Sequence, residues 1–118
     1  MTPFGLKLRQ LRAERGVQLK DMAAALQISS AYLSALEHGK KGLPSPMLVR
    51  QICGYFGLIW DEADEVERLV RLSDPRVVID TSGLSPEATE LANRLAREIS
   101  RLDGETIHRL LKELAALG

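Results

Sequence analysis

The chain has 118 residues, of which 45% are hydrophobic, so it can bury one small core with a modest appendage but not two large domains. Its single cysteine excludes an intramolecular disulfide, and His38 and His108 stand far apart without companion ligands, so we expect no metal and no cofactor. The net charge of zero hides a division: residues 1–60 carry 8 basic and 3 acidic side chains, whereas residues 61–118 carry 8 and 13. A basic N-terminal half suits a phosphate-binding surface.

The first segment is a predicted helix over residues 3–15. Thr2 is a good N-cap, Pro3 suits the first helical position and Gly16 suits the end. The segment is charged and lacks the apolar centre of a signal peptide, and no stretch of the chain approaches the roughly 20 apolar residues of a membrane span. We therefore expect a cytoplasmic protein that does not contact a membrane.

Residues 18–39 are predicted to form two short helices joined by a tight turn. Ser29 is a good N-cap for the second helix and Gly39 suits its end. The side chain of Gln18 can cap the first helix, although less well than serine or threonine. Such a pair is typical of a helix-turn-helix. The apolar residues at helical spacing are Leu19, Met22, Ala23 and Leu26, then Leu33 and Leu36.

Several spacings in the first 72 residues agree with one known pattern. They are LRxLRxxxG at residues 8–16, Met22-Ala23, Ile28-Ser29, Tyr32-Leu33 and Leu36-Glu37-x-Gly39-Lys40. Over residues 3–72 the chain resembles the phage repressor and Cro family, also called XRE-type regulators. The resemblance implies an all-α fold with a five-helix, repressor-like DNA-binding domain over residues 1–73. Its third helix, residues 30–37, would enter the major groove of double-stranded DNA.

The resemblance also implies roles for particular side chains of this groove helix. By position in the family motif, the base-facing residues are Ser30, Ala31, Ser34 and Ala35. None of them can form the bidentate pairing with a base that is worth ~1 to 3 kcal/mol, so direct readout is expected to be modest. Specificity would then come from DNA shape, dimer spacing or residues outside the helix. The resemblance further implies a structural ion pair between Arg12 and Glu37.

Candidate phosphate contacts lie at both ends of the helix pair. The start of the second helix can offer backbone N–H groups to a phosphate, although Leu19 stands where the family commonly has glutamine. Lys40 and Lys41 are the strongest candidates, with a solvated loop as the alternative reading. Tyr32 can either bond a phosphate or cover the edge of the core. The phosphate-facing candidates are Gln18, Lys20, Tyr32, His38, Lys40 and Lys41.

Two further helices are predicted before residue 73. Ser45 and Pro46 begin one helix, and its apolar face includes Cys53, which we interpret as a small buried residue rather than a nucleophile. Acidic residues at 61–67 begin the next helix and complement its dipole. Without histidine partners these carboxylates are interpreted as a solvated face rather than as an acid/base or metal site. Trp60 is expected to anchor the junction between the two helices.

The composition changes after residue 73, where the N-terminal domain should end. Residues 74–85 are interpreted as a linker, within which the β-branched run at 76–81 predicts a short strand or an extended segment packed on the domain. Residues 86–118 carry two apolar stripes separated by a turn, which predicts a C-terminal helical hairpin. We expect dimerisation through it in preference to packing within the chain. The expected dimerisation residues are Leu91, Leu95, Ile99, Leu110, Leu111 and Leu114.

The resulting hypothesis is a sequence-specific, double-stranded DNA-binding transcriptional regulator, a repressor that acts as a homodimer on a two-fold operator. The alternative is an antitoxin-like protein whose C-terminal helices bind a toxin partner while the N-terminal domain represses its own promoter. An enzyme is not expected, because no nucleophile–base or metal constellation is present.

Overall fold

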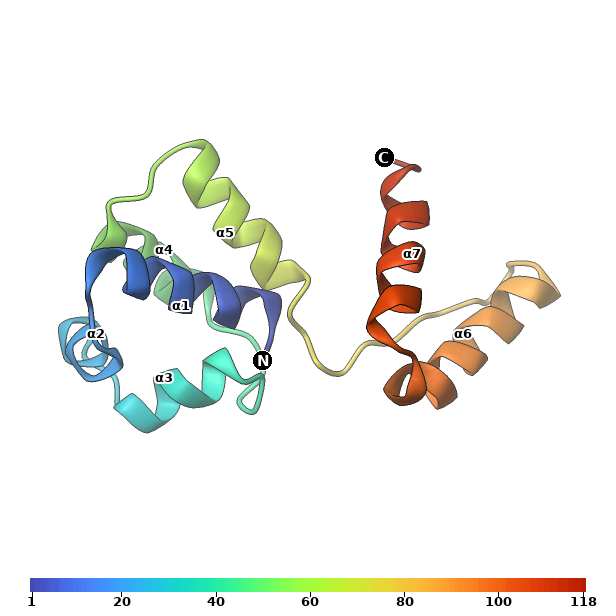
Figure 1. Cartoon of the computed structure of the whole chain (residues 1–118), viewed down its shortest axis with the longest axis horizontal. Helices are drawn as coiled ribbons and strands as arrows, with labels where there is room; N and C mark the ends of the chain where they lie inside the picture. Colours follow the sequence, from blue (N-terminus) through green and yellow to red (C-terminus); the bar gives the residue numbers. More distant parts are fainter. The chain divides into compact units, whose positions relative to one another are not determined.

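The structure, a computed structural model, describes all 118 residues and contains seven α-helices and no strand (Figure 1). The predicted all-α fold is therefore confirmed. The chain divides into two compact units, Met1–Val77 and Val78–Gly118, which we call the head and the tail. The head contains α1 (Pro3–Arg15), α2 (Leu19–Leu26), α3 (Ser30–Glu37), α4 (Pro46–Phe56) and α5 (Asp61–Arg71); the tail contains α6 (Pro86–Glu98), a 3-10 turn (Ile99–Arg101) and α7 (Gly104–Ala115). None of these helices combines the length and apolar character that a membrane crossing needs.

Side-chain caps fix most helix starts of the head where the sequence predicts them. Thr2, Ser29 and Ser45 each accept a hydrogen bond from a backbone amide in the following first turn. Gly16, in the left-handed conformation with a φ of 64°, ends α1. The prediction for Gln18 is wrong: its backbone occupies the N-cap position of α2, but its side chain makes no capping hydrogen bond. A glutamine side chain is longer than the serine or threonine side chains that usually fill this role.

The core of the head is one cluster of apolar side chains to which all five helices contribute. Helix α1 lies between α3 and α5, which pack against its opposite sides (Figure 1). Fully burying one such side chain contributes about 1.5–3 kcal/mol, so this cluster fixes the position of every head helix. Its largest fully buried members are Phe4, Leu8, Met22, Leu33, Leu36, Ile52 and Val66.

Trp60 does not anchor the junction of α4 and α5, and that prediction is wrong. Its side chain is 81% exposed, and its backbone has a positive φ of 53°. Leu58 takes the inward position instead: it is 6% exposed, and its amide donates to the carbonyl oxygen of Cys53 at 2.8 Å. Of the residues that connect α4 and α5, only Leu58 is buried.

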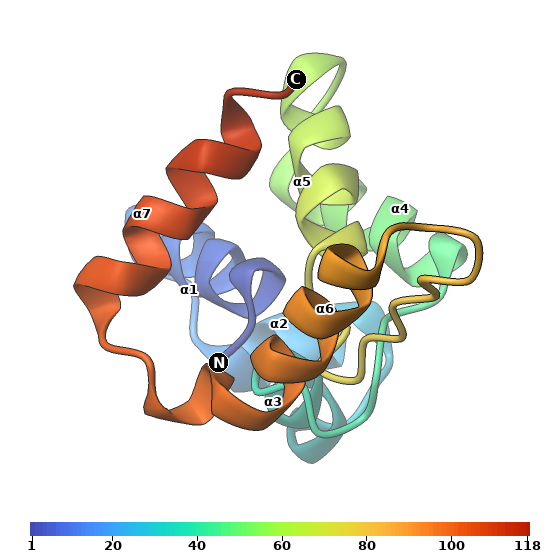
Figure 2. The same ribbon diagram turned by 90° about the vertical axis from the view of Figure 1, so that its right-hand side faces the viewer.

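The tail contains the two helices of the expected hairpin, but no side chain in it is buried. Ser85 caps α6 through the amide of Ala88, and Asp103 caps α7 through the amide of Thr106. From the turn that connects them, α6 and α7 diverge rather than lying side by side along their lengths (Figures 1 and 2). Their apolar faces therefore remain open, as the exposed fractions of Leu91 (59%) and Leu114 (64%) indicate.

The β-branched run at residues 76–81 forms no strand. Val78 is 92% exposed and Val77 is 71% exposed, so the segment buries neither side chain. A strand needs a partner with which to exchange backbone hydrogen bonds, and an all-helical chain supplies none. These residues therefore form no strand despite their β propensity.

Candidate nucleic-acid interface

Helices α2 and α3 are joined by a three-residue turn, residues 27–29, whose geometry sets their mutual angle. Gln27 adopts a left-handed conformation with a φ of 59°, and the amide of Ile28 donates to the carbonyl oxygen of Ala23 at 3.0 Å. The hydroxyl of Ser29 then accepts the amide of Tyr32 at 3.0 Å and starts α3. Ala23 is 1% exposed, and its small side chain lets the two helices approach closely. The arrangement is that of a helix-turn-helix.

The outward face of α3 consists of small, uncharged side chains. Leu33 and Leu36 point into the core and are almost completely buried. On the rest of the helix, Ser30 and Ala31 are exposed, whereas Ser34 and Ala35 are half-buried. Because none of these four side chains is long, they extend little beyond the backbone of the helix on this face.

The end of α3 is held by α1 through both side chains and backbone. The Nη2 atom of Arg12 lies 2.8 and 3.0 Å from the two carboxylate oxygens of Glu37. The side chain of Glu37 is 3% exposed and that of Arg12 is 15% exposed, so the pair is largely withdrawn from water. The amide of Thr2 also donates to the carbonyl oxygen of Glu37 at 3.2 Å. These contacts fix the orientation in which α3 presents its outward face.

Two residues that the sequence interpretation missed complete this support. Gly5 packs so closely on α3 that an added Cβ would lie 2.6 Å from the carbonyl carbon of Glu37. Ser73 is buried after the end of α5, where its hydroxyl accepts the amide of Phe4 at 2.9 Å and donates to the carbonyl oxygen of Leu69 at 2.5 Å. Glycine has a low helix propensity, so its presence in the first turn of a predicted helix could have indicated a close contact at this position. No sequence signal marked Ser73.

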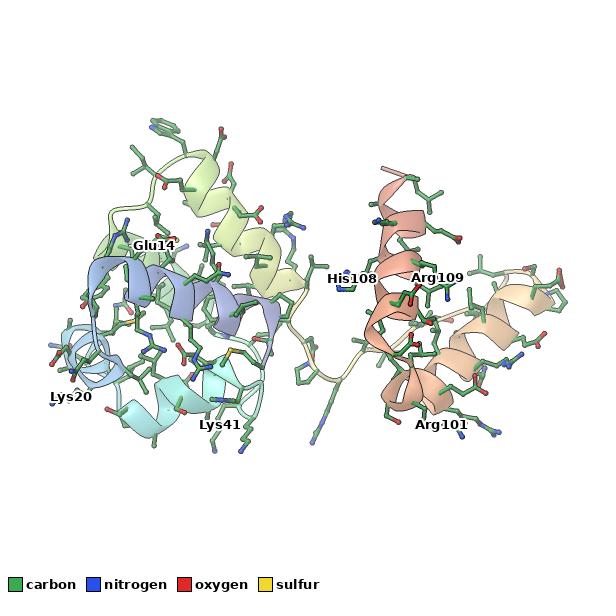
Figure 3. All side chains as sticks on the ribbon, in the orientation of Figure 1. Glu14, Lys20, Lys41, Arg101, His108 and Arg109 are labelled. Carbon is green, nitrogen blue, oxygen red and sulfur yellow. The ribbon has the colours of Figure 1, made fainter.

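The cations expected to face phosphates all lie on the surface of the head. Lys20 is exposed in the first turn of α2, and Lys41 is exposed in the turn after α3 (Figure 3). Lys40, which precedes Lys41, is exposed as well. Gln18, at the start of α2, is exposed as well. The two ends of the helix pair therefore both carry donors that could reach a nucleic-acid backbone.

Tyr32 and His38 are partly engaged within the head. Tyr32 is half-buried and packs against the core, so its ring covers the edge of the core. His38 is exposed, but its Nδ1 lies 2.8 Å from the carbonyl oxygen of Ser34. Since a carbonyl oxygen only accepts, Nδ1 must carry the proton in this contact.

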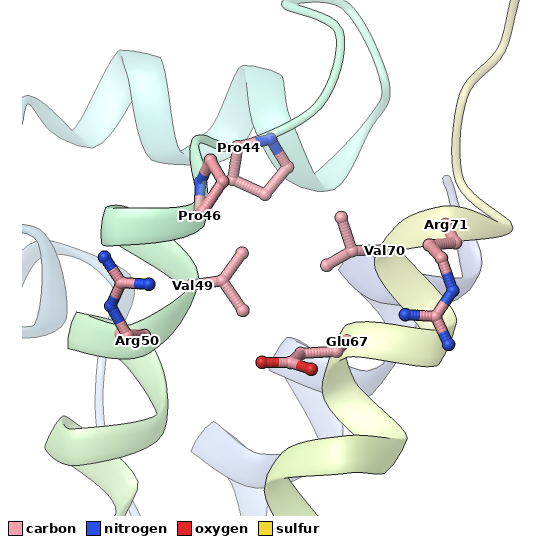
Figure 4. Close-up of a pocket in the computed structure, with 7 residues that line it drawn as sticks. All are labelled: Pro44, Pro46, Val49, Arg50, Glu67, Val70 and Arg71. Atoms are coloured by element: carbon pink, nitrogen blue, oxygen red, sulfur yellow. The ribbon is translucent and has the colours of Figure 1, made fainter.

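A second surface feature, a pocket of about 300 Å³, lies between α4 and α5 (Figure 4). Proline and valine side chains supply the apolar part of its lining, and Arg50, Glu67 and Arg71 contribute charges without forming an ion pair with one another. Nearby Cys53 is buried, and this burial, with a smaller contribution from the charge of Glu67, raises the pKa of its thiol. Its environment favours the neutral thiol over the nucleophilic thiolate. The pocket is lined by Pro44, Pro46, Val49, Arg50, Glu67, Val70 and Arg71.

Residues 3–69 match the family described as the helix-turn-helix domain. The chain belongs to this family. The XRE-type resemblance is thus confirmed at the level of the family. The match covers α1 to α4 and most of α5, which together form and support the face described above.

Three curated relatives are similar to this helix-turn-helix protein over 52 residues, or 44% of its chain. They are an uncharacterized HTH-type transcriptional regulator, RghRB, of Bacillus subtilis (40% identical), the HTH-type transcriptional regulator DdrOP3 of Deinococcus deserti (46%) and the HTH-type transcriptional repressor RghR of Bacillus subtilis (36%). The matched stretch spans 37%, 40% and 38% of their respective lengths. Their names describe transcriptional regulators.

Proposed function

We propose that this protein is a cytoplasmic, sequence-specific transcriptional regulator that binds double-stranded DNA and represses by occupying a two-fold operator as a homodimer. The observation that carries the proposal is the presentation of α3. Its outward face is free, while its inward face and its end are fixed by Leu33, Leu36 and the Arg12–Glu37 ion pair. A helix held in this way, preceded by a tight turn and a supporting helix of equal length, suits insertion into the major groove.

In the proposed complex, base contacts come from Ser30, Ala31, Ser34 and Ala35. Serine hydroxyls can donate to or accept from base edges, and alanine methyl groups can contact the methyl group of thymine. Lys40, Lys41 and the start of α2 would contact phosphates on either side of the groove and fix the register of the head on the duplex. Because the base-facing side chains are small, much of the specificity is assigned to DNA shape and to the spacing of two half-sites.

The tail would join the two copies. None of its side chains is buried, although Leu91, Leu95 and Ile99 in α6 and its turn, and Leu110, Leu111 and Leu114 in α7, form apolar stripes. Two copies of the tail could cover these stripes and would double the number of DNA contacts. Light scattering on the full chain and on a truncated protein ending at Val77 tests this role. A dimer that survives removal of the tail would contradict it.

DNA binding is tested by a genome-wide DNA pull-down with the wild type and with Lys40→Ala/Lys41→Ala in parallel, followed by salt titration on the strongest site. The wild type should select discrete, two-fold symmetric sites. The double variant should bind more weakly, and the slope of log K against log salt should fall by about two, since each lost phosphate contact lowers it by roughly 0.9.

The matched control is Arg68→Ala/Arg71→Ala, which removes the same charge from α5, across α1 from α3 (Figure 1). It should leave the slope close to that of the wild type. Equal losses in both variants would show that only net charge matters and would contradict the assigned phosphate contacts. Diffuse or absent binding by the wild type would contradict the regulator and shift support to the antitoxin-like alternative, in which the exposed tail helices bind a toxin partner.

A further inference from the structure

The charges of α6 are confined to one side of its apolar stripe. At about 3.6 residues per turn, Ala88, Leu91, Ala92 and Leu95 share one face of the helix. The side chains along one flank of this face are all uncharged: Thr89, Asn93, Ala96 and Ser100. The charged side chains of the helix and its 3-10 turn all fall on the other flank: Glu87, Glu90, Arg94, Arg97, Glu98 and Arg101.

This apolar face needs a covering surface. Leu91 is 59% exposed and Ile99 is 58% exposed, and α7 diverges from α6 instead of covering it (Figure 2). Helices of the length of α6 are marginal in water without tertiary packing. The pattern of charged side chains beside the apolar face of α6 indicates which surface can cover this face.

We propose that α6 pairs with α6 of a second copy in antiparallel orientation, about a two-fold axis near Leu95. The inference rests on the homodimer proposed above and specifies how its tails meet. In an antiparallel pair of helices, equivalent flanks face each other, so the charged flank of one copy meets the charged flank of the second. In a parallel pair, the charged flank of one copy would meet the uncharged flank of the second copy. Its charged side chains would then have no oppositely charged side chain opposite them in the second copy.

An axis near Leu95 gives a self-complementary register. Glu87 then lies near Arg101 of the second copy, and Arg94 lies near Glu98 of the second copy. Each pair occurs twice, because the two halves of a two-fold interface are identical. The two Arg94 side chains also meet across the axis, where Glu90 and Glu98 of their own chains offset their repulsion. Within one chain, Arg94 already lies 3.9 Å from Glu90 and 3.7 Å from Glu98, which places these side chains along the same flank. Leu91 would pack against Ile99 of the second copy.

Charge reversal in the full chain tests this register by sedimentation equilibrium. Glu87→Arg alone, or Arg101→Glu alone, replaces two attractive contacts with two repulsive ones in each dimer. Either change should raise the dimer dissociation constant about tenfold, since exposed pairs are individually weak. The double variant Glu87→Arg/Arg101→Glu restores attraction with exchanged signs and should return the constant to within about threefold of the wild type.

Glu105→Arg provides the matched control, because Glu105 is the acidic residue in the first turn of α7, as Glu87 is in α6. Like Glu87→Arg in α6, this variant loses a favourable interaction between an acidic side chain and the helix dipole. It should leave the dimer dissociation constant unchanged. If the single reversals have no effect, or the double variant is not restored, the antiparallel pairing is overturned while the homodimer stands. A wild type that remains monomeric overturns both the antiparallel pairing and the homodimer. The salt titration on DNA tests the DNA-binding proposal separately.

Discussion

Gly5 of α1 lies directly against the backbone carbonyl of Glu37, the last residue of α3. The contact leaves no room for a side chain, because a Cβ on Gly5 would overlap the carbonyl oxygen and would lie 2.7 Å from the Cα of Glu37. The first turn of one helix therefore sets the distance at which the proposed groove helix is held.

Replacing Gly5 with alanine should destabilise the head by at least about 2 kcal/mol, since overpacking against backbone cannot be relieved by a side-chain rotation. Thermal unfolding measures the loss. The matched control is Gly54→Ala in α4, where an added Cβ meets nothing within 4 Å. Alanine there should stabilise by about 0.5–1 kcal/mol through its helix propensity. Changes of the same sign in both variants would contradict the assigned close approach.

The Arg12–Glu37 ion pair should be costly to break from one side. Glu37→Ala leaves a mostly buried guanidinium without its partner and should lower the free energy of unfolding by about 3 kcal/mol. A double-mutant cycle with Arg12→Ala in urea measures the coupling between the two side chains. Glu65→Ala, which breaks an exposed ion pair with Arg68, is the control and should have little effect. A cycle with no coupling energy would show that the pair does not hold α3.

Ser73 should stabilise the head through the amide of Phe4, which lies in the first turn of α1 and has no partner within the helix. Ser73→Ala leaves this buried amide unsatisfied and should cost about 1–3 kcal/mol. Hydrogen exchange should become faster at Phe4 in particular. Ser100→Ala, at an exposed position without a side-chain hydrogen bond, should change stability by less than about 0.5 kcal/mol. Unchanged exchange at Phe4 would contradict the assigned contact.

Trp60→Gly should raise the melting temperature of the head. Trp60 has φ and ψ of 53° and −124°, a conformation that favours glycine, and its side chain is too exposed to lose much packing. Relief of the backbone strain should contribute about 1 kcal/mol. Calorimetry is the suitable measurement, because the variant lacks tryptophan fluorescence. Ile59→Gly, at a neighbouring position without a positive φ, should give no gain.

The start of α7 should depend on acid pH through Asp103. Hydrogen bonds from the hydroxyl and the backbone amide of Thr106 lower the pKa of this carboxyl group. A lowered pKa in the folded state means that the cap stabilises fully above the ordinary aspartate value and is lost as the pH falls through the folded value. The amide resonance of Thr106, followed by NMR against pH, should report this step. Asp103→Asn keeps a capping oxygen and should abolish the pH dependence.

The sequence by itself determined the local features of the head. Its caps at Thr2, Ser29 and Ser45 lie where the serines and threonines precede apolar periodicity, because a cap depends only on residues within one helical turn. Helical periodicity likewise predicted that Leu33 and Leu36 would be buried, which leaves the opposite face of α3 free for the proposed contact with DNA.

Only the tertiary structure decided the features that join distant parts of the chain. The contacts between Gly5 and Glu37 and between Phe4 and Ser73 link residues more than 30 positions apart, and no local pattern encodes which surfaces will meet. The exposure of Trp60 was decided by the path of the connection between α4 and α5, which turns Leu58 rather than Trp60 into the core. Apolar periodicity predicted the stripes of α6 and α7, but it specifies a face to be covered and not the surface that covers it.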